Sequence, residues 1–212
     1  MFENDAVILF QGDSITDCGR SRLRNNGLGS GYVRMIAGAL KKAAPDAGIR
    51  VLNRGISGNR AIDLVERWQK DCIDLQPDYL SILIGVNDTW RAFDSNDYTA
   101  DVTFKARCRT ILEETLKKTQ AKIILLSPFL LDVNEKVTKM REDLSGKQRA
   151  VGELAQEYAA KWLDLDAVFA QACTTAPPTE FSLDGVHPTA KGHALIAAEW
   201  LKAWDVHLTA EV

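Results

Sequence analysis

The sequence predicts an α/β fold in which a parallel sheet of five strands is covered by helices on both faces. Short apolar runs alternate along the chain with longer stretches of helical periodicity, the order that a parallel sheet with crossover helices requires. The run at residues 79–84 is nearly continuous in apolar side chains, as expected for a strand buried on both faces. No linker, internal repeat or low-complexity tract interrupts the 212 residues, so we expect a single domain over residues 1–212.

The individual elements follow from these patterns in chain order. Apolar runs predict strands at residues 6–10, 49–52, 79–84, 122–126 and 162–165. Apolar side chains at helical spacing predict helices at residues 32–44, 61–75, 98–119, 137–161 and 190–204. A polar, glycine-rich segment at 17–31 and a proline-containing segment at 174–187 are expected to be loops.

Composition and charge disfavour several classes of function. Hydrophobic residues make up 46% of the chain and charged residues 26%, which is ordinary for a globular protein. The net charge is −3 and no basic face or tail stands out, which disfavours nucleic acid as a partner. No apolar stretch is long enough for a membrane span, and the N-terminal residues lack the basic start of a signal peptide. We therefore expect a cytoplasmic protein without membrane contact. The alternative of a signal peptide that has already been removed is left open.

The cysteines are expected to be free thiols. Cys18, Cys72, Cys108 and Cys173 include no Cys-x-x-Cys pair and are too few for a disulfide framework in a chain of this size. Cys18 lies four positions after Ser14 and could line a cleft, but we interpret it as a loop thiol without a role.

The most informative feature is a pair of segments near opposite ends of the chain. Gly12-Asp13-Ser14 follows an apolar run and predicts a tight turn that presents a hydroxyl group, and Asp184 precedes His187 by three positions. A serine that attacks a carbonyl needs a base to take its proton. The base in turn needs a group that fixes its tautomer. Either segment alone is common, because a serine after a strand is usually a turn or cap residue.

Two further segments make the combination specific. Residues 53–59 follow the strand at 49–52, and Gly85-Val86-Asn87-Asp88 follows the strand at 79–84. With these four segments the chain resembles the SGNH hydrolases, the GDSL-type esterases, which are named after a Ser, a Gly, an Asn and a His from four blocks. The matching residues are Ser14, Gly58, Asn87 and His187, with Asp184 completing a triad. Ile15 departs from the family's usual Leu at a position expected to be apolar packing.

The resemblance implies a fold and a set of roles. The fold is a three-layer α/β/α, flavodoxin-like arrangement. Ser14 is the implied nucleophile, His187 its general base and Asp184 the partner of the imidazole. The backbone N–H groups of Ser14 and Gly58 and the side-chain amide of Asn87 are the implied donors of an oxyanion hole.

Two longer strings, residues 12–20 and 85–91, are similar to a narrower branch that includes bacterial acetylxylan esterases and related carbohydrate acetylesterases. This similarity implies hydrolysis of short-chain acyl esters, acetyl above all, through an acyl-enzyme. The implied partner is a small-molecule ester such as an acetylated sugar, with no cofactor and no metal. Neither nucleic acid nor a membrane is an expected partner, and a homo-oligomer is left open.

Several other residues are candidates for contact with the substrate. Asp13, Trp90, Arg91 and Leu183 lie next to the four segments. Trp90 could stack on a sugar or pack against the scaffold, and we leave both interpretations open. We interpret Asp13 and Asp88 mainly as carboxylates that brace loops. Three arginines of the polar loop, Arg20, Arg22 and Arg24, could contact an anionic substrate, but a solvated loop is the favoured interpretation.

Three alternatives remain beside this hypothesis. The first is a lysophospholipase or thioesterase of the same family. The second is a metal hydrolase that uses Asp13, Asp184, His187 and His193, although no His-x-x-x-His pair supports it. The third is a non-catalytic protein that binds phosphate with the glycine-rich residues 27–31, which do not directly follow a strand. His193 and His207 are expected to be structural or solvated.

Overall fold

Five parallel strands form one sheet at the centre of the molecule. The computed structural model describes residues 2–23 and 27–206 of the chain. The strands are β1 (Val7–Gly12), β2 (Arg50–Asn53), β3 (Tyr79–Leu83), β4 (Lys122–Leu126) and β5 (Lys161–Leu163). They are hydrogen-bonded in the order β2-β1-β3-β4-β5, and every pair is parallel. This order is that of flavodoxin-like folds and confirms the predicted α/β class.

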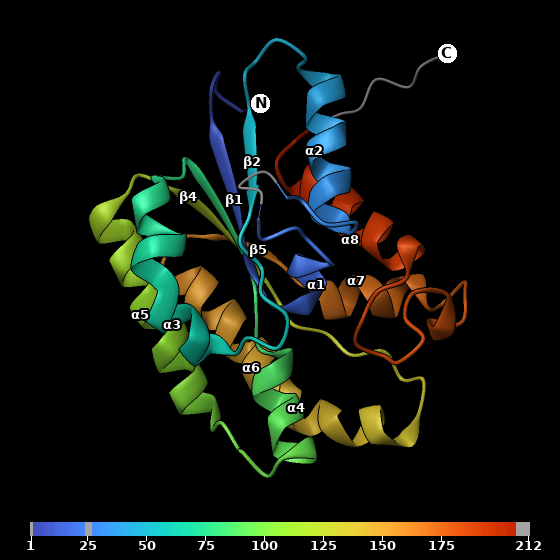
Figure 1. The fold of residues 1–212 in the computed structure, drawn as a ribbon. Helices are drawn as coiled ribbons and strands as arrows, with labels where there is room; N and C mark the ends of the chain where they lie inside the picture. Colours follow the sequence, from blue (N-terminus) through green and yellow to red (C-terminus); the bar gives the residue numbers. More distant parts are fainter. Residues whose placement is uncertain (1, 24–26, 207–212) are drawn as a thin grey trace.

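Helices connect the strands and form the outer layers. Their bounds are α1 (Ser14–Asp17), α2 (Tyr32–Ala43), α3 (Ala61–Asp71), α4 (Val86–Asp94), α5 (Asp101–Lys118), α6 (Glu135–Glu157), α7 (Leu165–Ala172) and α8 (Ala190–Ala203). Short 3-10 turns add Ile73–Leu75 and Pro178–Glu180. Figure 1 shows the strands running side by side, with α2 and α8 on one side and α3 and α5 on the other.

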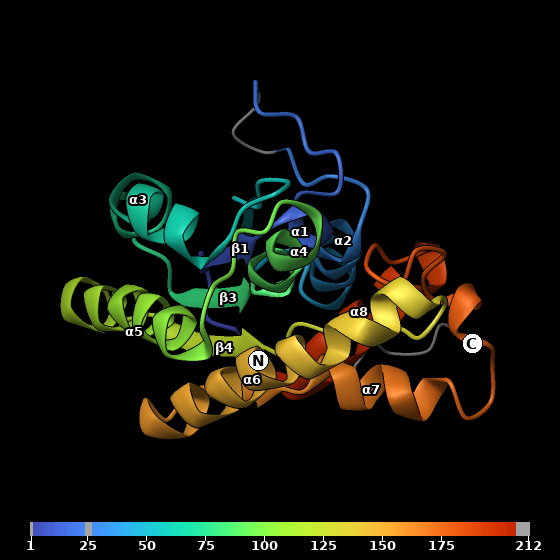
Figure 2. The ribbon, with the colours of Figure 1, turned by 90° about the horizontal axis from the view of Figure 1, so that it is seen from below.

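Two apolar clusters hold the layers together, one on each face of the sheet. One cluster joins the sheet to α2 and α8 through side chains such as Ile36 and Trp200. The other joins it to α3 and α5 through side chains such as Leu64 and Phe104. Figure 2 shows the strands between these two groups of helices. α6 contributes to both clusters, because Met140 in its first half packs into one and Leu154 in its second half into the other.

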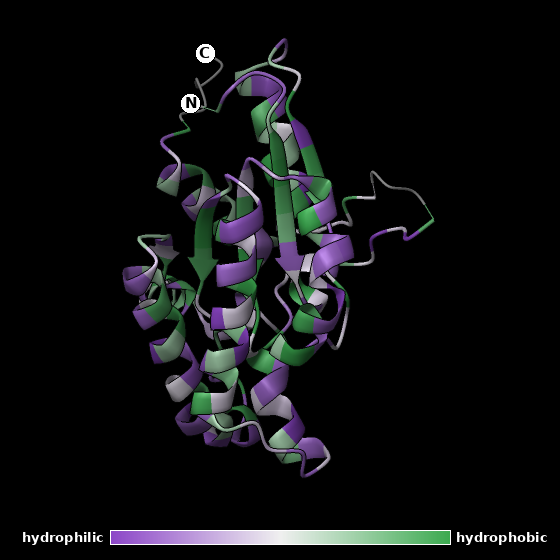
Figure 3. Ribbon diagram, turned by 90° about the vertical axis from the view of Figure 1, so that its left-hand side faces the viewer, coloured by the Kyte–Doolittle hydropathy of each residue, from purple (hydrophilic) through white to green (hydrophobic). Residues whose placement is uncertain are grey.

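The helices are amphipathic and the strands largely apolar. Figure 3 shows hydrophilic and hydrophobic residues alternating along the helices, whereas the strands behind them are mostly hydrophobic. All residues of β1 and β3 are buried, as expected for central strands covered on both faces. Among residues 2–23 and 27–206, no helix is both long enough and apolar enough to cross a bilayer.

The structure differs from the sequence prediction mainly in short helices. The predicted helix at 61–75 ends at Asp71 and continues as a 3-10 turn, and the one predicted from residue 98 begins at Asp101. The helices α1, α4 and α7 were not predicted. They span four, nine and eight residues, too few turns for an apolar periodicity to stand out. Two of them, α1 and α4, begin within the segments that carry Ser14 and Asn87.

The buried contact between Trp200 and Ser81 generates a prediction about stability. The indole N–H of Trp200 in α8 donates to the hydroxyl of Ser81 in β3 over 3.1 Å, and both side chains are almost fully buried. We expect Ser81→Ala to lower the free energy of unfolding by about 1–3 kcal/mol, because it leaves a buried donor without an acceptor. Adding Trp200→Phe should then cost less than Trp200→Phe does alone. Urea unfolding of both single variants and the double variant measures this, and strictly additive losses would contradict it.

Candidate active site

The segments singled out from the sequence converge on one edge of the sheet. β1, β2 and β3 are parallel neighbours, so their carboxyl ends lie side by side. Ser14 follows β1 after one intervening residue, residues 54–60 follow β2, and α4 begins shortly after β3. Ligands of open parallel sheets bind at this edge, where loops leave the strands in different directions.

Ser14 is the first residue of α1 and is placed by a tight strand-to-helix turn. Asp13 caps this helix, since its Oδ1 accepts a hydrogen bond from the N–H of Ile15 over 3.0 Å. The turn closes with hydrogen bonds from the N–H of Asp17 to the carbonyl of Asp13 and from the N–H of Cys18 to the carbonyl of Ser14. This geometry presents the Ser14 hydroxyl at the end of β1.

His187 and Asp184 meet Ser14 from the other end of the chain. The Nε2 atom of His187 lies 2.9 Å from the Oγ of Ser14, and its Nδ1 lies 2.7 Å from Oδ2 of Asp184. The second carboxylate oxygen of Asp184 accepts hydrogen bonds from the backbone N–H groups of Val186 and His187. The structure thus brings together the three residues predicted as the triad, in the order hydroxyl, imidazole, carboxylate.

The loop that carries His187 is tied down at several points. Ser182 pairs with Pro188 in an antiparallel bridge, and the N–H of Leu131 donates to the carbonyl of Gly185 over 2.9 Å. Thr189 caps α8 directly after this loop. The His187 and Asp184 side chains still expose 54% and 50% of their surface, so the site is open to water.

The charge state of Asp184 suits an imidazole partner. Partial burial alone would raise the pKa of Asp184, but hydrogen bonds from the His187 ring and from backbone N–H groups outweigh it and lower the pKa to about 2. The carboxylate is therefore ionised at neutral pH. An ionised acceptor at Nδ1 holds the imidazole proton there, which leaves Nε2 free to accept the proton of Ser14.

Gly58 and Asn87 lie in the segments that follow β2 and β3 at the same edge of the sheet. Gly58 has φ +83°, a backbone conformation that glycine adopts without a steric cost. Among the described residues, no acceptor takes a hydrogen bond from the Gly58 N–H. Asn87 is the second residue of α4, and its Nδ2 donates to the carbonyl of Asn59 over 3.0 Å. An amide nitrogen carries two protons, so this bond leaves a second one for a ligand.

Two buried carboxylates lie under the site. Asp88 in α4 accepts the N–H of Ala61, the first residue of α3, through Oδ2, while no described group hydrogen-bonds to its Oδ1. Asp13 likewise leaves its Oδ2 without a described partner. Burial raises the pKa of Asp13 to about 7 and that of Asp88 to about 6, although backbone hydrogen bonds act in the opposite direction. Both side chains brace local backbone, in line with the sequence interpretation.

The other candidate contacts lie around the rim. Leu183 is 77% exposed directly before Asp184. Trp90 packs partly against the core, and the Nζ of Lys136 lies 4.4 Å from the centre of its ring. Arg91 pairs with Asp94 over 2.8 Å, and its guanidinium lies next to the space that a side chain at residue 58 would enter.

The polar loop contacts its own residues and neighbouring segments. Arg20 donates through Nε to the carbonyl of Gly55 over 2.6 Å, and Arg22 pairs with Asp17. Cys18 is a free thiol, as are the other three cysteines, and its sulfur lies 3.4 Å from Nε2 of His193. His193 is buried and accepts the N–H of Tyr32. Arg24 and His207 lie outside the described residues.

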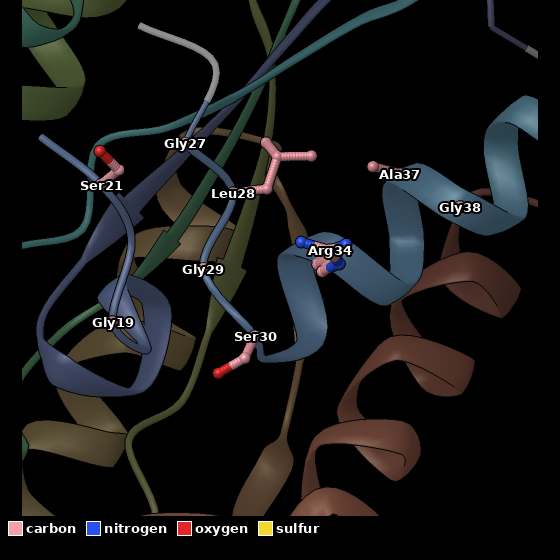
Figure 4. Close-up of a pocket in the computed structure, with 9 residues that line it drawn as sticks. All are labelled: Gly19, Ser21, Gly27, Leu28, Gly29, Ser30, Arg34, Ala37 and Gly38. Carbon is pink, nitrogen blue, oxygen red and sulfur yellow. The ribbon is translucent and has the colours of Figure 1, made fainter. Parts of the chain in front are cut away.

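A hollow of about 700 Å³ opens elsewhere, between the polar loop and α2 (Figure 4). Its lining consists of Gly19, Ser21, Gly27, Leu28, Gly29, Ser30, Arg34, Ala37 and Gly38. None of the residues predicted for catalysis takes part. Of the glycine-rich residues 27–31, the first four line this hollow and Gly31 caps α2. Within residues 2–23 and 27–206, no cluster of three or more His, Cys, Asp or Glu side chains is suited to hold a metal ion.

Comparisons with known proteins agree with this geometry. A model of the GDSL-like lipase/acylhydrolase family matches residues 10–195. The chain is 39% identical over 203 residues to an acetylxylan esterase of Geobacillus stearothermophilus, a match that covers 92% of each protein. The crystal structure of an acetylxylan esterase from that organism superposes with a TM-score of 0.90 at 36% identity and covers 99% of both chains.

Other solved structures extend the likeness. A crystal structure of a protein from Parabacteroides merdae, described as a GDSL-like lipase, has a TM-score of 0.91 at 37% identity and covers 98% of this chain and 99% of its own. Structures of the Geobacillus enzyme also include variants described as catalytic mutants. These replace a serine, an aspartate and a histidine three positions after that aspartate.

The parallel α/β sheet thus carries a hydrogen-bonded Ser, His and Asp at its carboxyl edge. The matched family model spans most of the chain and the curated relative exceeds a third in identity. The chain therefore belongs to the GDSL-like lipase/acylhydrolase family and is a carboxylic ester hydrolase.

The raised pKa of Asp13 predicts a pH effect on stability. An aspartate in the unfolded chain titrates near pH 3.9. In the folded protein the pKa of Asp13 is about 7, so between these values only the unfolded state releases the proton. Stability from this group is therefore lost as the pH rises from about 4 to 7, by roughly 3–4 kcal/mol at most.

Asp13→Asn, which keeps the helix cap, should remove this loss. Its free energy of unfolding relative to the wild type should rise between pH 5 and pH 8 in urea titrations. The exposed Asp46→Asn is the matched control and should track the wild type. A difference between Asp13→Asn and wild type that is the same at both pH values would mean that Asp13 is ionised in the folded protein.

Proposed function

We propose that this protein is a serine esterase that removes short acyl groups, acetyl above all, from a hydroxylated carbohydrate. The observation that carries the proposal is the chain of contacts from Ser14 Oγ to His187 Nε2 at 2.9 Å and from His187 Nδ1 to Asp184 at 2.7 Å. Both distances fall in the range of hydrogen bonds that allow direct proton transfer.

In the proposed first step, His187 takes the proton of Ser14 while Oγ attacks the carbonyl carbon of the ester. The carbonyl oxygen becomes negatively charged, and the N–H groups of Ser14 and Gly58 and the amide of Asn87 donate hydrogen bonds to it. The ionised Asp184 stabilises the imidazolium that forms. Collapse of the tetrahedral intermediate expels the alcohol, which takes the proton from His187, and leaves an acyl group on Ser14.

In the second step, His187 takes a proton from water, and the resulting hydroxide attacks the acyl carbon. A second tetrahedral intermediate uses the same donors and collapses to the free acid, while His187 returns the proton to Oγ of the leaving Ser14. The half-exposed His187 gives water direct access for this step. The step needs no group beyond these side chains and water.

The name of the curated relative supports the proposed substrate class, since the acetylxylan esterase is 39% identical to this chain over 203 residues. The rim residues fit a short acyl group on a polar alcohol. Trp90 and Leu183 offer limited apolar surface, whereas Arg91 and Lys136 bring charge close to it. The family's lysophospholipase and thioesterase activities form the alternative, which requires room for a long chain.

Replacing the nucleophile tests the mechanism. Ser14→Ala should fold normally and lose ester hydrolysis by about 10³-fold or more, because no other described hydroxyl contacts His187 Nε2. The measurement is kcat with p-nitrophenyl acetate, and mass spectrometry after an organophosphate should find the label on Ser14. Ser145→Ala on α6 is the matched control and should keep full activity.

A tenth of wild-type turnover in Ser14→Ala would contradict the proposal. Activity in wild type should also survive prolonged incubation with a chelator. Loss that a divalent cation restores would instead support the metal hydrolase.

Acyl length tests the substrate class. Each buried methylene contributes about 0.8 kcal/mol, so an enzyme with an apolar groove gains nearly 5 kcal/mol from six extra methylenes of an octanoyl ester. We expect no such gain here and a preference for acetyl over octanoyl of about tenfold or more in kcat/KM. The measurement compares p-nitrophenyl acetate, butyrate and octanoate below their solubility limits. If octanoate equals or exceeds acetate, the lysophospholipase or thioesterase alternative takes the place of the acetylesterase.

A further inference from the structure

We propose that Asp17 is a positioning residue that fastens the loop carrying Gly58 to the helix carrying Ser14. This inference rests on the proposed function, since it concerns the donor that Gly58 would supply. We call residues 54–60 the oxyanion loop. Asp17 is the last residue of α1, whose first residue is Ser14, and it is 4% exposed.

Asp17 holds the residue next to Gly58 by two hydrogen bonds. Its Oδ2 accepts the backbone N–H of Ser57 over 3.0 Å and the hydroxyl of Ser57 over 3.1 Å. The same oxygen accepts a hydrogen bond from Nη2 of Arg22 over 3.2 Å, and Oδ1 accepts the N–H of Arg20 over 3.1 Å. One carboxylate thus fixes both the main chain and the side chain of Ser57.

Holding Ser57 restricts the backbone of Gly58, the next residue along the chain. The Ser57 N–H is engaged by Asp17, whereas the Gly58 N–H has no acceptor among the described residues. Because Asp17 holds the backbone and the side chain of Ser57, the N–H of Gly58 has less freedom to change its direction. A preorganised donor costs no reorganisation when charge develops on the substrate, so the direction of this N–H matters more in the transition state than in the bound substrate.

The oxyanion loop is anchored at several points, among them the N–H of Ile56, which donates to the carbonyl of Gly12 over 3.0 Å. At its start, Gly55 packs so closely on α1 that an added Cβ would lie 2.4 Å from the Asp17 nitrogen. At its end, the carbonyl of Asn59 accepts the Asn87 amide. Ser57 lies between these anchors, directly before Gly58, and Asp17 holds both its backbone and its side chain.

A carboxylate is required at residue 17 because donors face both of its oxygens. Burial raises the pKa of Asp17, but hydrogen bonds from Ser57, Arg22 and Arg20 outweigh it and keep the pKa below its usual value. An asparagine offers one acceptor oxygen and turns its NH2 group toward the remaining donors. Asp17→Asn therefore loses the contact with Ser57 or the one with Arg20.

The test compares Asp17→Asn with two matched variants. Arg22→Ala removes the charged partner of Asp17. The Arg22 side chain is 57% exposed, and its loss leaves both hydrogen bonds between Asp17 and Ser57 in place. Asn87→Ala is the reference for loss of one proposed donor. With p-nitrophenyl acetate, Asp17→Asn should lower kcat by about 10- to 100-fold and change KM by less than about threefold. Arg22→Ala should stay within about threefold of wild type in both.

Two readouts separate positioning from a general structural effect. Affinity for a methyl trifluoromethyl ketone, which forms a tetrahedral oxyanion on Ser14, should fall in Asp17→Asn by about the same factor as kcat/KM. The acid limb of the pH profile of kcat/KM should keep its midpoint, because His187 and Asp184 are untouched. A lowered melting temperature with unchanged kcat and unchanged ketone affinity would overturn the inference, as would an equal loss in Arg22→Ala.

Ser57→Ala keeps the inference falsifiable if Asp17→Asn does not fold. Ser57 is exposed, and the substitution removes one of the two bonds to Asp17. We expect kcat to fall by about three- to tenfold with KM unchanged, and an unaltered kcat would overturn the inference.

Activity in Ser14→Ala would refute the proposed function itself, whereas an inactive Ser14→Ala beside a fully active Asp17→Asn would refute only the role of Asp17.

Discussion

The contact between Ser14 and His187 joins residues 173 positions apart, and it depends on two independent pieces of geometry. One is the strand-to-helix turn after β1, which Asp13 caps. The other is the loop before α8, which is bound to its surroundings through Ser182 and Gly185. The turn and the loop are far apart along the chain. The parallel sheet and its two apolar clusters must therefore set the distance between Ser14 and His187. A close-packed core is rigid enough to do so, because its side chains interlock with few voids.

Chemically identical carboxyl groups behave differently within this small region. Asp184 is half exposed and accepts several hydrogen bonds, which lower its pKa. Asp17 is buried but surrounded by donors, with the same result. Asp13 and Asp88 are buried, and one oxygen of each accepts no hydrogen bond from the described residues, although Arg107 lies 3.9 Å from that of Asp88. Their pKa values are raised. The supply of hydrogen-bond donors decides whether the pKa of each of these buried or half-buried carboxyl groups is raised or lowered.

Much of the fold could be predicted from the sequence because buried parallel strands leave a strong signal. β4 was predicted with its observed bounds, and the other strands within about two residues. The helices α1 and α4 could not be predicted in the same way, since they are short and begin with polar residues that serve the site. Ser14, His187 and Asp184 were predicted from the resemblance of their segments to those of a known family. Their mutual distances come from the fold.

Asp17 escaped prediction for a different reason. It stands at the start of a segment rich in polar residues and glycine, a composition typical of a solvated loop. Its partner Ser57 lies 40 positions away, and nothing in either local pattern indicates that the two residues meet. The signal that could have found it is the parallel pairing of β1 with β2, which brings the segments after both strands to the same edge. Such pairing is a long-range property that periodicity alone does not reveal.

The exposure of His187 and Asp184 has a consequence for the fate of the acyl group. An acyl-enzyme at an open edge of the sheet is in contact with bulk solvent and with any dissolved alcohol. Under the proposed mechanism, the imidazole activates whichever hydroxyl reaches it, and water has the advantage only of its concentration. A second sugar held at the rim is therefore a competing acceptor, and in a concentrated sugar solution part of the acyl flux passes from one carbohydrate to another without producing free acid.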